Sequence, residues 1–152
     1  MRRLIALVVL AGASFGGYRL YSTSFGPVAH YKKFAETVLH RRYDAAAAMC
    51  DGLTAADLEK LGSQERIGAG PPMFQSLFPS LFDIQSRETT PDGSTVINAV
   101  QTVRFNPAGV ESAMRPAMFA TLKQVVTLRK ENGAWKVVSF ENTFMKMDST
   151  SR

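Results

Sequence analysis

The spacing of apolar residues changes from a helical to a strand-like period near the middle of the chain. Residues 28–39 place apolar side chains at intervals of three and four positions, which predicts an amphipathic helix beginning near Pro27. Its expected solvent-facing side consists of His30, Lys32, Lys33, Glu36 and Thr37. Residues 82–89 and 95–105 instead alternate apolar and polar side chains, which predicts two strands.

Two more short helices are predicted before the strands begin. In residues 40–52, Asp44 is expected to cap a run of alanines, which have the strongest helix propensity. In residues 54–62, Thr54 and Asp57 have the spacing of a capping box in which Asp replaces the usual Glu. A glycine follows or ends each segment, as is typical of helix C-termini.

The strands are expected to form two hairpins. Turn residues at 91–94 separate the first two strands, and a third is expected from about Met114 to Lys130. The pair Asn132-Gly133 then predicts a two-residue type I′ turn into a fourth strand. An uninterrupted register from this turn pairs Leu128 with Val137, Val126 with Ser139, Thr127 with Val138 and Val125 with Phe140.

This order of elements predicts an α+β fold. N-terminal helices are expected to pack on one face of a curved, cone-like antiparallel sheet of at least four strands. A hydrophobic N-terminal helix is expected to precede them.

Residues 1–21 have the layout of an export segment or a membrane anchor. Arg2 and Arg3 precede an apolar run, and the uncharged stretch of residues 4–18 is shorter than the roughly 20 residues that span a bilayer. We favour an uncleaved anchor in the cell membrane with the body outside the cytoplasm. The alternative is cleavage and release as a secreted or periplasmic protein.

The remaining boundaries follow from composition. We expect a linker at residues 22–27, one domain at residues 28–147 and a short tail at residues 148–152.

The formal net charge of +5 is concentrated at the N-terminus. Three of the 18 basic residues lie within the first 24 residues, which carry no acid, so the rest has 15 basic and 13 acidic residues. A net charge of +2 without a long basic cluster argues against a nucleic-acid partner. The single cysteine, Cys50, and two separated histidines predict neither a disulfide nor a metal site, and no cofactor motif is present.

Two stretches resemble the nuclear transport factor 2-like superfamily. They are "VAHYKKFAETVLHRRYDAAAAMC" at residues 28–50, similar to the family's opening helices, and "VVTLRKENGAWKVVSF" at residues 125–140, similar to its closing hairpin. The resemblance covers residues 28–144. It implies a conical pocket between helices and sheet for a small apolar molecule, and a sheet surface that often forms homodimers.

Seven aromatic residues are candidates for lining such a pocket, although core packing is the competing interpretation: Tyr31, Phe34, Tyr43, Phe78, Phe82, Phe119 and Trp135. An enzyme of the isomerase or cyclase type would need Tyr31 or Tyr43 to face a strand acid such as Asp83 or Glu141. No acid matches the family's catalytic base.

Three hypotheses for function therefore remain. We favour a non-catalytic, membrane-tethered or exported domain of the bacterial cell envelope that binds a small apolar ligand or a protein partner. The alternatives are a small isomerase or cyclase and a structural dimerisation module.

Overall fold

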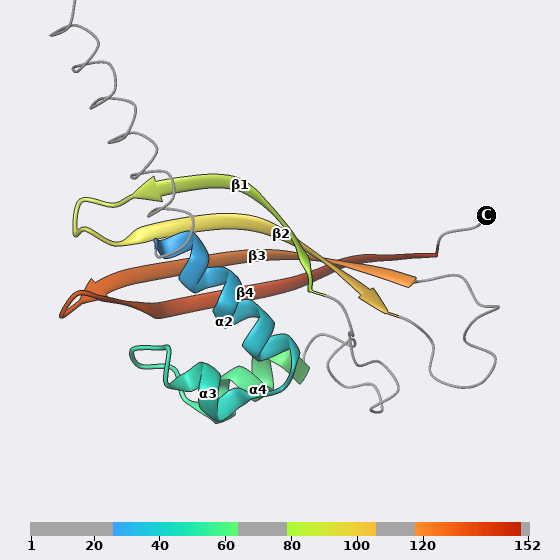
Figure 1. Cartoon of the computed structure of the whole chain (residues 1–152), viewed down its shortest axis with the longest axis horizontal. Coiled ribbons are helices and arrows are strands. Elements are labelled where there is room, and N and C mark those ends of the chain that lie inside the picture. The colour runs from blue at the N-terminus through green and yellow to red at the C-terminus, as the bar shows by residue number, and fades with distance from the viewer. Residues whose placement is uncertain (1–25, 64–78, 106–117, 150–152) are drawn as a thin grey trace, which may run out of the picture.

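The computed structural model describes residues 26–63, 79–105 and 118–149 and shows an α+β fold (Figure 1). Helices come first and strands follow, as the change in apolar spacing predicted. The helices are α2 (Pro27–Leu39), α3 (Tyr43–Ala47) and α4 (Ala55–Ser63), and the strands are β1 (Leu81–Thr89), β2 (Thr95–Phe105), β3 (Met118–Glu131) and β4 (Ala134–Ser149).

Helix α2 begins at Pro27, whose fixed φ suits the first helical position. The predicted polar face is wrong at one position, because Thr37 is buried and its hydroxyl donates a hydrogen bond to the carbonyl oxygen of Lys33 at 2.7 Å. This local bond satisfies the hydroxyl inside the helix, so a threonine can be buried at this position.

The starts of the two shorter helices differ in how far they match the sequence pattern. Asp44 lies in the first turn of α3, after Arg42 at the N-cap, so the prediction that Asp44 is the cap is wrong by two positions. The capping box of α4 is confirmed: the Asp57 backbone N–H donates to Thr54 Oγ1 at 3.2 Å, and the Thr54 N–H donates to Asp57 Oδ2 at 3.0 Å.

The four strands form one antiparallel sheet in the order β1-β2-β3-β4, so each strand pairs with its neighbour in the sequence. Figure 1 shows the long strands bending together, with α2 lying across one face of the sheet. The side chains of Ile97, Ala99 and Val103 on β2 are buried on this face, which confirms the alternation predicted for residues 95–105.

The last hairpin has the predicted turn, but its register changes beyond the first few pairs. Leu128 pairs with Val137 as predicted, whereas Val126 pairs with Phe140 and not with Ser139. The shift occurs at a bulge between Thr127 and Leu128, where β4 contains one extra residue. The bulge turns Phe140 toward the core, where only 5% of it is exposed.

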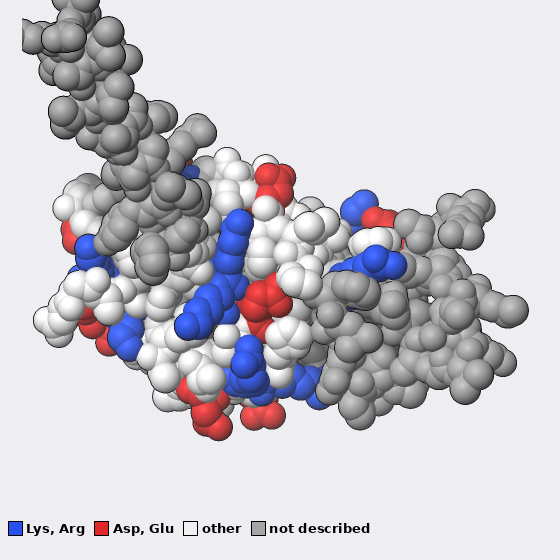
Figure 2. Space-filling view, viewed as in Figure 1, with Lys and Arg blue, Asp and Glu red and all other residues white. Residues whose placement is uncertain are grey.

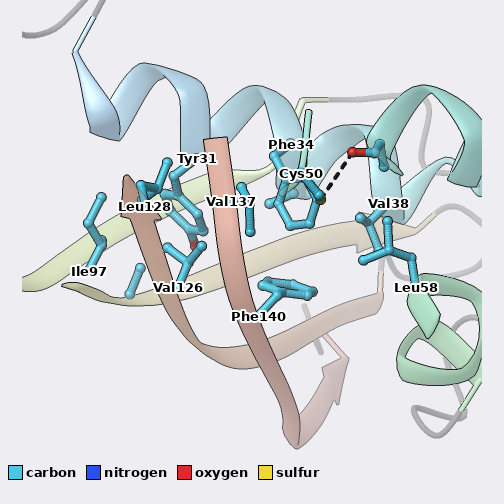
Figure 3. Close-up of a cluster of buried hydrophobic side chains, with 13 residues drawn as sticks. Tyr31, Phe34, Val38, Cys50, Leu58, Ile97, Val126, Leu128, Val137 and Phe140 are labelled. Carbon is cyan, nitrogen blue, oxygen red and sulfur yellow. Dashed lines mark hydrogen bonds between the residues drawn. The ribbon is translucent and has the colours of Figure 1, made fainter. Parts of the chain in front are cut away.

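The main core lies between α2 and the sheet (Figure 3). Tyr31, Phe34 and Val38 extend from successive turns of α2, and the Phe34 ring meets the edge of Phe140 with ring centroids 5.0 Å apart. The main contributions from the other elements are Cys50, Leu58, Ile97, Val126, Leu128 and Val137. Cys50 is buried, and its thiol donates to the Ala46 carbonyl oxygen.

The expected hydrophobic N-terminal helix and the segment boundary at residue 21 lie outside the described residues. Within the ranges that the structure does describe, no helix is both long enough and apolar enough to cross a membrane.

Gly133→Val is expected to lower the free energy of unfolding by about 1–3 kcal/mol, because a β-branched residue is strained at the positive φ of this turn. The φ angles are 48° at Asn132 and 85° at Gly133, and no atom lies within 4 Å of an added Cβ. The cost would therefore come from the backbone. Urea unfolding measures it, and Gly133→Asn is the matched control because asparagine tolerates this conformation. Equal losses for both variants would contradict the type I′ turn.

Candidate functional site

A row of hydrogen-bonded amide side chains, two of them buried, crosses the helix-facing side of the sheet. Gln101 lies on β2, Gln124 on β3 and Asn142 on β4, and Gln124 pairs directly with Asn142 in the strand register. The Gln124 amide nitrogen donates to Gln101 Oε1 at 2.7 Å and to Asn142 Oδ1 at 2.8 Å. The exposed fractions of Gln101 and Gln124 are only 1% and 2%, so the bonds between them compensate the cost of burying amides.

This amide row is connected to α2 at two points. The Tyr31 hydroxyl donates to Gln124 Oε1 at 2.6 Å. Gln101 Nε2 donates to Ser80 Oγ at 2.8 Å, and the Ser80 backbone N–H donates to Glu36 Oε1 at 2.6 Å. Burial raises the pKa of Tyr31 well above its ordinary value. Tyr31 therefore stays protonated and acts as a hydrogen-bond donor.

The amide row separates two apolar regions. The main core lies on one side, and a second cluster built around Val103, Ala120 and Leu122 lies on the other. Leu39 at the end of α2 and Met118 at the start of β3 pack against this second cluster. The hydrogen-bonded row thus divides the inner face of the sheet into two halves.

Strand β4 adds exposed apolar side chains to the second half. Phe144 pairs with Leu122 and Met147 pairs with Ala120, so both belong to the inner face of the sheet. Their exposed fractions are 38% and 43%. We call the following set the distal apolar patch: Leu39, Val103, Met118, Ala120, Leu122, Phe144 and Met147.

Asn142 borders the distal apolar patch and keeps one hydrogen-bonding group available. Its Oδ1 accepts a bond from Gln124, while its Nδ2 has no partner among the residues that the structure describes. Asn142 is half-buried, two positions before Phe144 on the same strand. The arrangement offers apolar contact next to the NH2 group of Asn142, which can donate hydrogen bonds.

Five of the seven candidate aromatic residues belong to the main core or pack against it. Tyr31 and Phe34 are buried in the main core. Phe82 packs edge-on against Tyr31 with ring centroids 5.5 Å apart, and Lys32 Nζ lies 5.8 Å from the Phe82 ring centroid. Tyr43 and Trp135 are half-buried and pack against the outside of the same core. These residues surround the main core and not the distal apolar patch.

The other two candidates lie elsewhere. Phe119 pairs with Arg104 and Asp148, which places it on the sheet face that turns away from α2. Phe78 lies outside the described residues.

The strand acids are separated from the tyrosines. Asp83 pairs with Val100 and Glu141 with Val125, so both acids are on the outer face of the sheet, where they are exposed. Tyr31 faces the opposite side. The arrangement of tyrosine and strand acid that an isomerase-type enzyme requires is therefore not found in the described part of the chain. No group of three metal-binding side chains occurs there either.

The amide row was missed at the sequence level, although the pattern contained a signal for it. Gln101 interrupts the inward-facing series of Ile97, Ala99 and Val103, and Gln124 interrupts the series on β3. A long polar side chain at an inward-facing position needs a partner. Two such positions on neighbouring strands were therefore grounds to expect a buried network.

Charged side chains on the face that Figure 2 shows are interspersed, with lysines and arginines next to acids. One cluster is defined by Arg129, whose guanidinium contacts Glu131 and Asp51. The hydrogen bonds that the Arg129 guanidinium donates to Glu131, together with the nearby carboxylates of Glu131 and Asp51, raise the pKa of Arg129. This cluster joins the hairpin to the segment after α3 and is a structural contact.

The chain matches no family model, and no curated protein sequence is significantly similar to it.

Gln124→Leu is expected to destabilise the protein by about 3 kcal/mol or more, because it leaves the Tyr31 hydroxyl and the oxygens of Gln101 and Asn142 without partners. Tyr31→Phe is expected to cost less, about 1–3 kcal/mol, because it leaves only Gln124 Oε1 unpaired. Adding Tyr31→Phe to Gln124→Leu should cost little more, since their shared bond is already lost. Chemical unfolding of the three variants measures these values, and strictly additive costs would contradict the network.

Stability is expected to fall as the pH drops from about 7.5 to about 5.5, because the pKa of His30 is lowered in the folded state. Burial is the main cause, and Lys136 and Lys33 add to it against the raising effect of the Met49 carbonyl. The unfolded chain then binds more protons than the folded one in this range. His30→Asn should flatten the pH dependence of thermal unfolding. A slope in this variant as steep as in the unaltered chain would contradict this assignment.

Proposed function

We propose that this chain is a non-catalytic domain of the bacterial cell envelope that binds a small apolar molecule carrying a hydrogen-bond acceptor. The observation that carries the proposal is the distal apolar patch, which is partly exposed at Phe144 and Met147 and borders the available N–H donor of Asn142. Small-molecule sites typically combine apolar surface with a few fixed polar groups. A carbonyl, ether or carboxylate oxygen on the ligand would accept the bond from Asn142.

The described chemistry supports binding over catalysis. The amide row consists of neutral groups, and the strand acids Asp83 and Glu141 lie on the outer face of the sheet. A general acid or base would need a titratable group within hydrogen-bond reach of the bound molecule. Asn142 and the apolar side chains around it can orient a ligand but cannot exchange protons with it.

We further infer that the body has the cone-like fold of the nuclear transport factor 2-like superfamily. Support comes from the order of helices before a four-stranded antiparallel sheet, from the bending of that sheet in Figure 1, and from α2 lying across its inner face.

For the location of the protein we retain the interpretation that residues 1–21 anchor it in the cell membrane with the body outside. The charge-then-apolar order of that segment supports it. Cleavage and release as a secreted or periplasmic protein is the alternative. Either location would expose the distal apolar patch to lipids, lipid precursors or other apolar compounds of the envelope.

Native mass spectrometry of the full chain, extracted from its cells in a mild detergent, is expected to show a bound small molecule. Asn142→Asp should remove it, because the new carboxylate still accepts the bond from Gln124 but repels an acceptor on the ligand. Thr143→Asp is the matched control: it adds the same charge at the next position, which is exposed and pairs with Lys123 on the outer face. Absence of the adduct from the unaltered chain, or equal loss in both variants, would contradict the proposal.

A further inference from the structure

Strand β4 lies at one edge of the sheet, and its two halves differ in whether another described segment pairs with them. The segment after α3 covers the first half: Cys50 forms a parallel bridge with Val137. The Asp51 N–H donates to the Val137 carbonyl at 2.8 Å, and the Val137 N–H donates to the Met49 carbonyl at 3.0 Å. The protein thus satisfies this part of the edge by itself.

The second half of β4 has no such cover among the described residues. Figure 1 shows it running past α3 and α4 toward the C-terminus. Met145, Lys146, Met147 and Asp148 are exposed, and Phe144, Met145 and Met147 are three of the four large apolar side chains that are exposed in the described parts of the chain. An open edge with exposed apolar residues is a template for pairing with another strand.

The charges on this half of the strand are suited to a second copy of the same strand. Lys146 and Asp148 lie on the same face of β4, two positions apart, and form an ion pair at 2.7 Å with more than half of each side chain exposed. In an antiparallel pair of identical strands centred on Met147, each Lys146 lies opposite the Asp148 of the other copy. Two such cross-strand pairs are favourable.

Neighbouring registers are less favourable. A two-fold axis at Lys146 would place the two lysines opposite each other, and an axis at Asp148 would do the same with the two aspartates. Like charges directly opposite are destabilising. A two-fold axis perpendicular to the sheet also gives each copy the same contacts, as closed dimers require.

We propose that two copies of this chain associate through the second half of β4, in antiparallel register about Met147, so that the two described four-stranded sheets join edge to edge. Backbone hydrogen bonds along the open edge and the reciprocal Lys146 and Asp148 pairs hold the dimer. The pairing uses backbone groups and the charged side chains of Lys146 and Asp148, although Met147 also belongs to the distal apolar patch.

The register can be tested by disulfide crosslinking of the full chain in detergent solution. Residues directly opposite in antiparallel strands have Cα atoms about 4.5–5.5 Å apart, which is within the range for a disulfide. Met147→Cys should therefore give a crosslinked dimer on mild oxidation. Met145→Cys is the control: it lies at a second bulge, where β4 again contains one extra residue, and its two copies would be about 13 Å apart along the strands and beyond disulfide reach. The native Cys50 is buried in both variants.

Exchanging the charges at positions 146 and 148 supplies a second test of the register, because it compares a single variant with the double variant that restores the opposite charges. In the Met147→Cys chain, Lys146→Asp should reduce crosslinking at least tenfold, since it places acids opposite each other. Adding Asp148→Lys should restore it. Crosslinking at position 145 as strong as at 147, no crosslinked dimer at 147, or no restoration by the exchanged pair would each overturn the proposed interface. Unchanged thermal unfolding of each variant would show that a change in crosslinking does not result from a loss of folding.

Discussion

The hydrogen bond from Tyr31 to Gln124 is the contact on which the arrangement of the described body depends. It joins the first helix of the body to the third strand across 93 positions of sequence, and both partners are almost completely buried. Apolar contacts between α2 and the sheet favour burial but fix no single position of the helix. A buried hydrogen bond does so, because any shift leaves costly unpaired groups.

The amide row to which Gln124 belongs divides the inner face of the sheet. On one side, Phe34 and Phe140 with their neighbours form a filled core; on the other, the distal apolar patch reaches the surface at Phe144. The amide row ends at Asn142, whose remaining N–H group borders that patch. A network that holds the helix in place thus also supplies the polar group that could orient a ligand. This link between stability and binding is the physical basis of the proposed function.

Much of the fold could be predicted from local pattern, since the periodicity of residues 28–39 and 95–105 reports which side of each element is buried. The Asn132-Gly133 turn was equally predictable, because positive φ angles restrict the residues that fit. The bulge that turns Phe140 inward was not, as nothing in the spacing shows an extra residue. Of the candidate site, the aromatic residues were misleading because large rings fill cores as well as pockets. Asn142 becomes a candidate only after its cross-strand partner Gln124 is known.

The side-chain amide protons of Gln101, Gln124 and Asn142, observed by NMR in the full chain, test the central claim most directly. Our account predicts that the Gln101 and Gln124 amides are protected from solvent exchange with or without ligand. Adding the small molecule recovered from the native protein should shift the Asn142 amide resonances and leave those of the two glutamines nearly unchanged. Rapid solvent exchange at Gln124, or a ligand that leaves the Asn142 resonances in place, would contradict it.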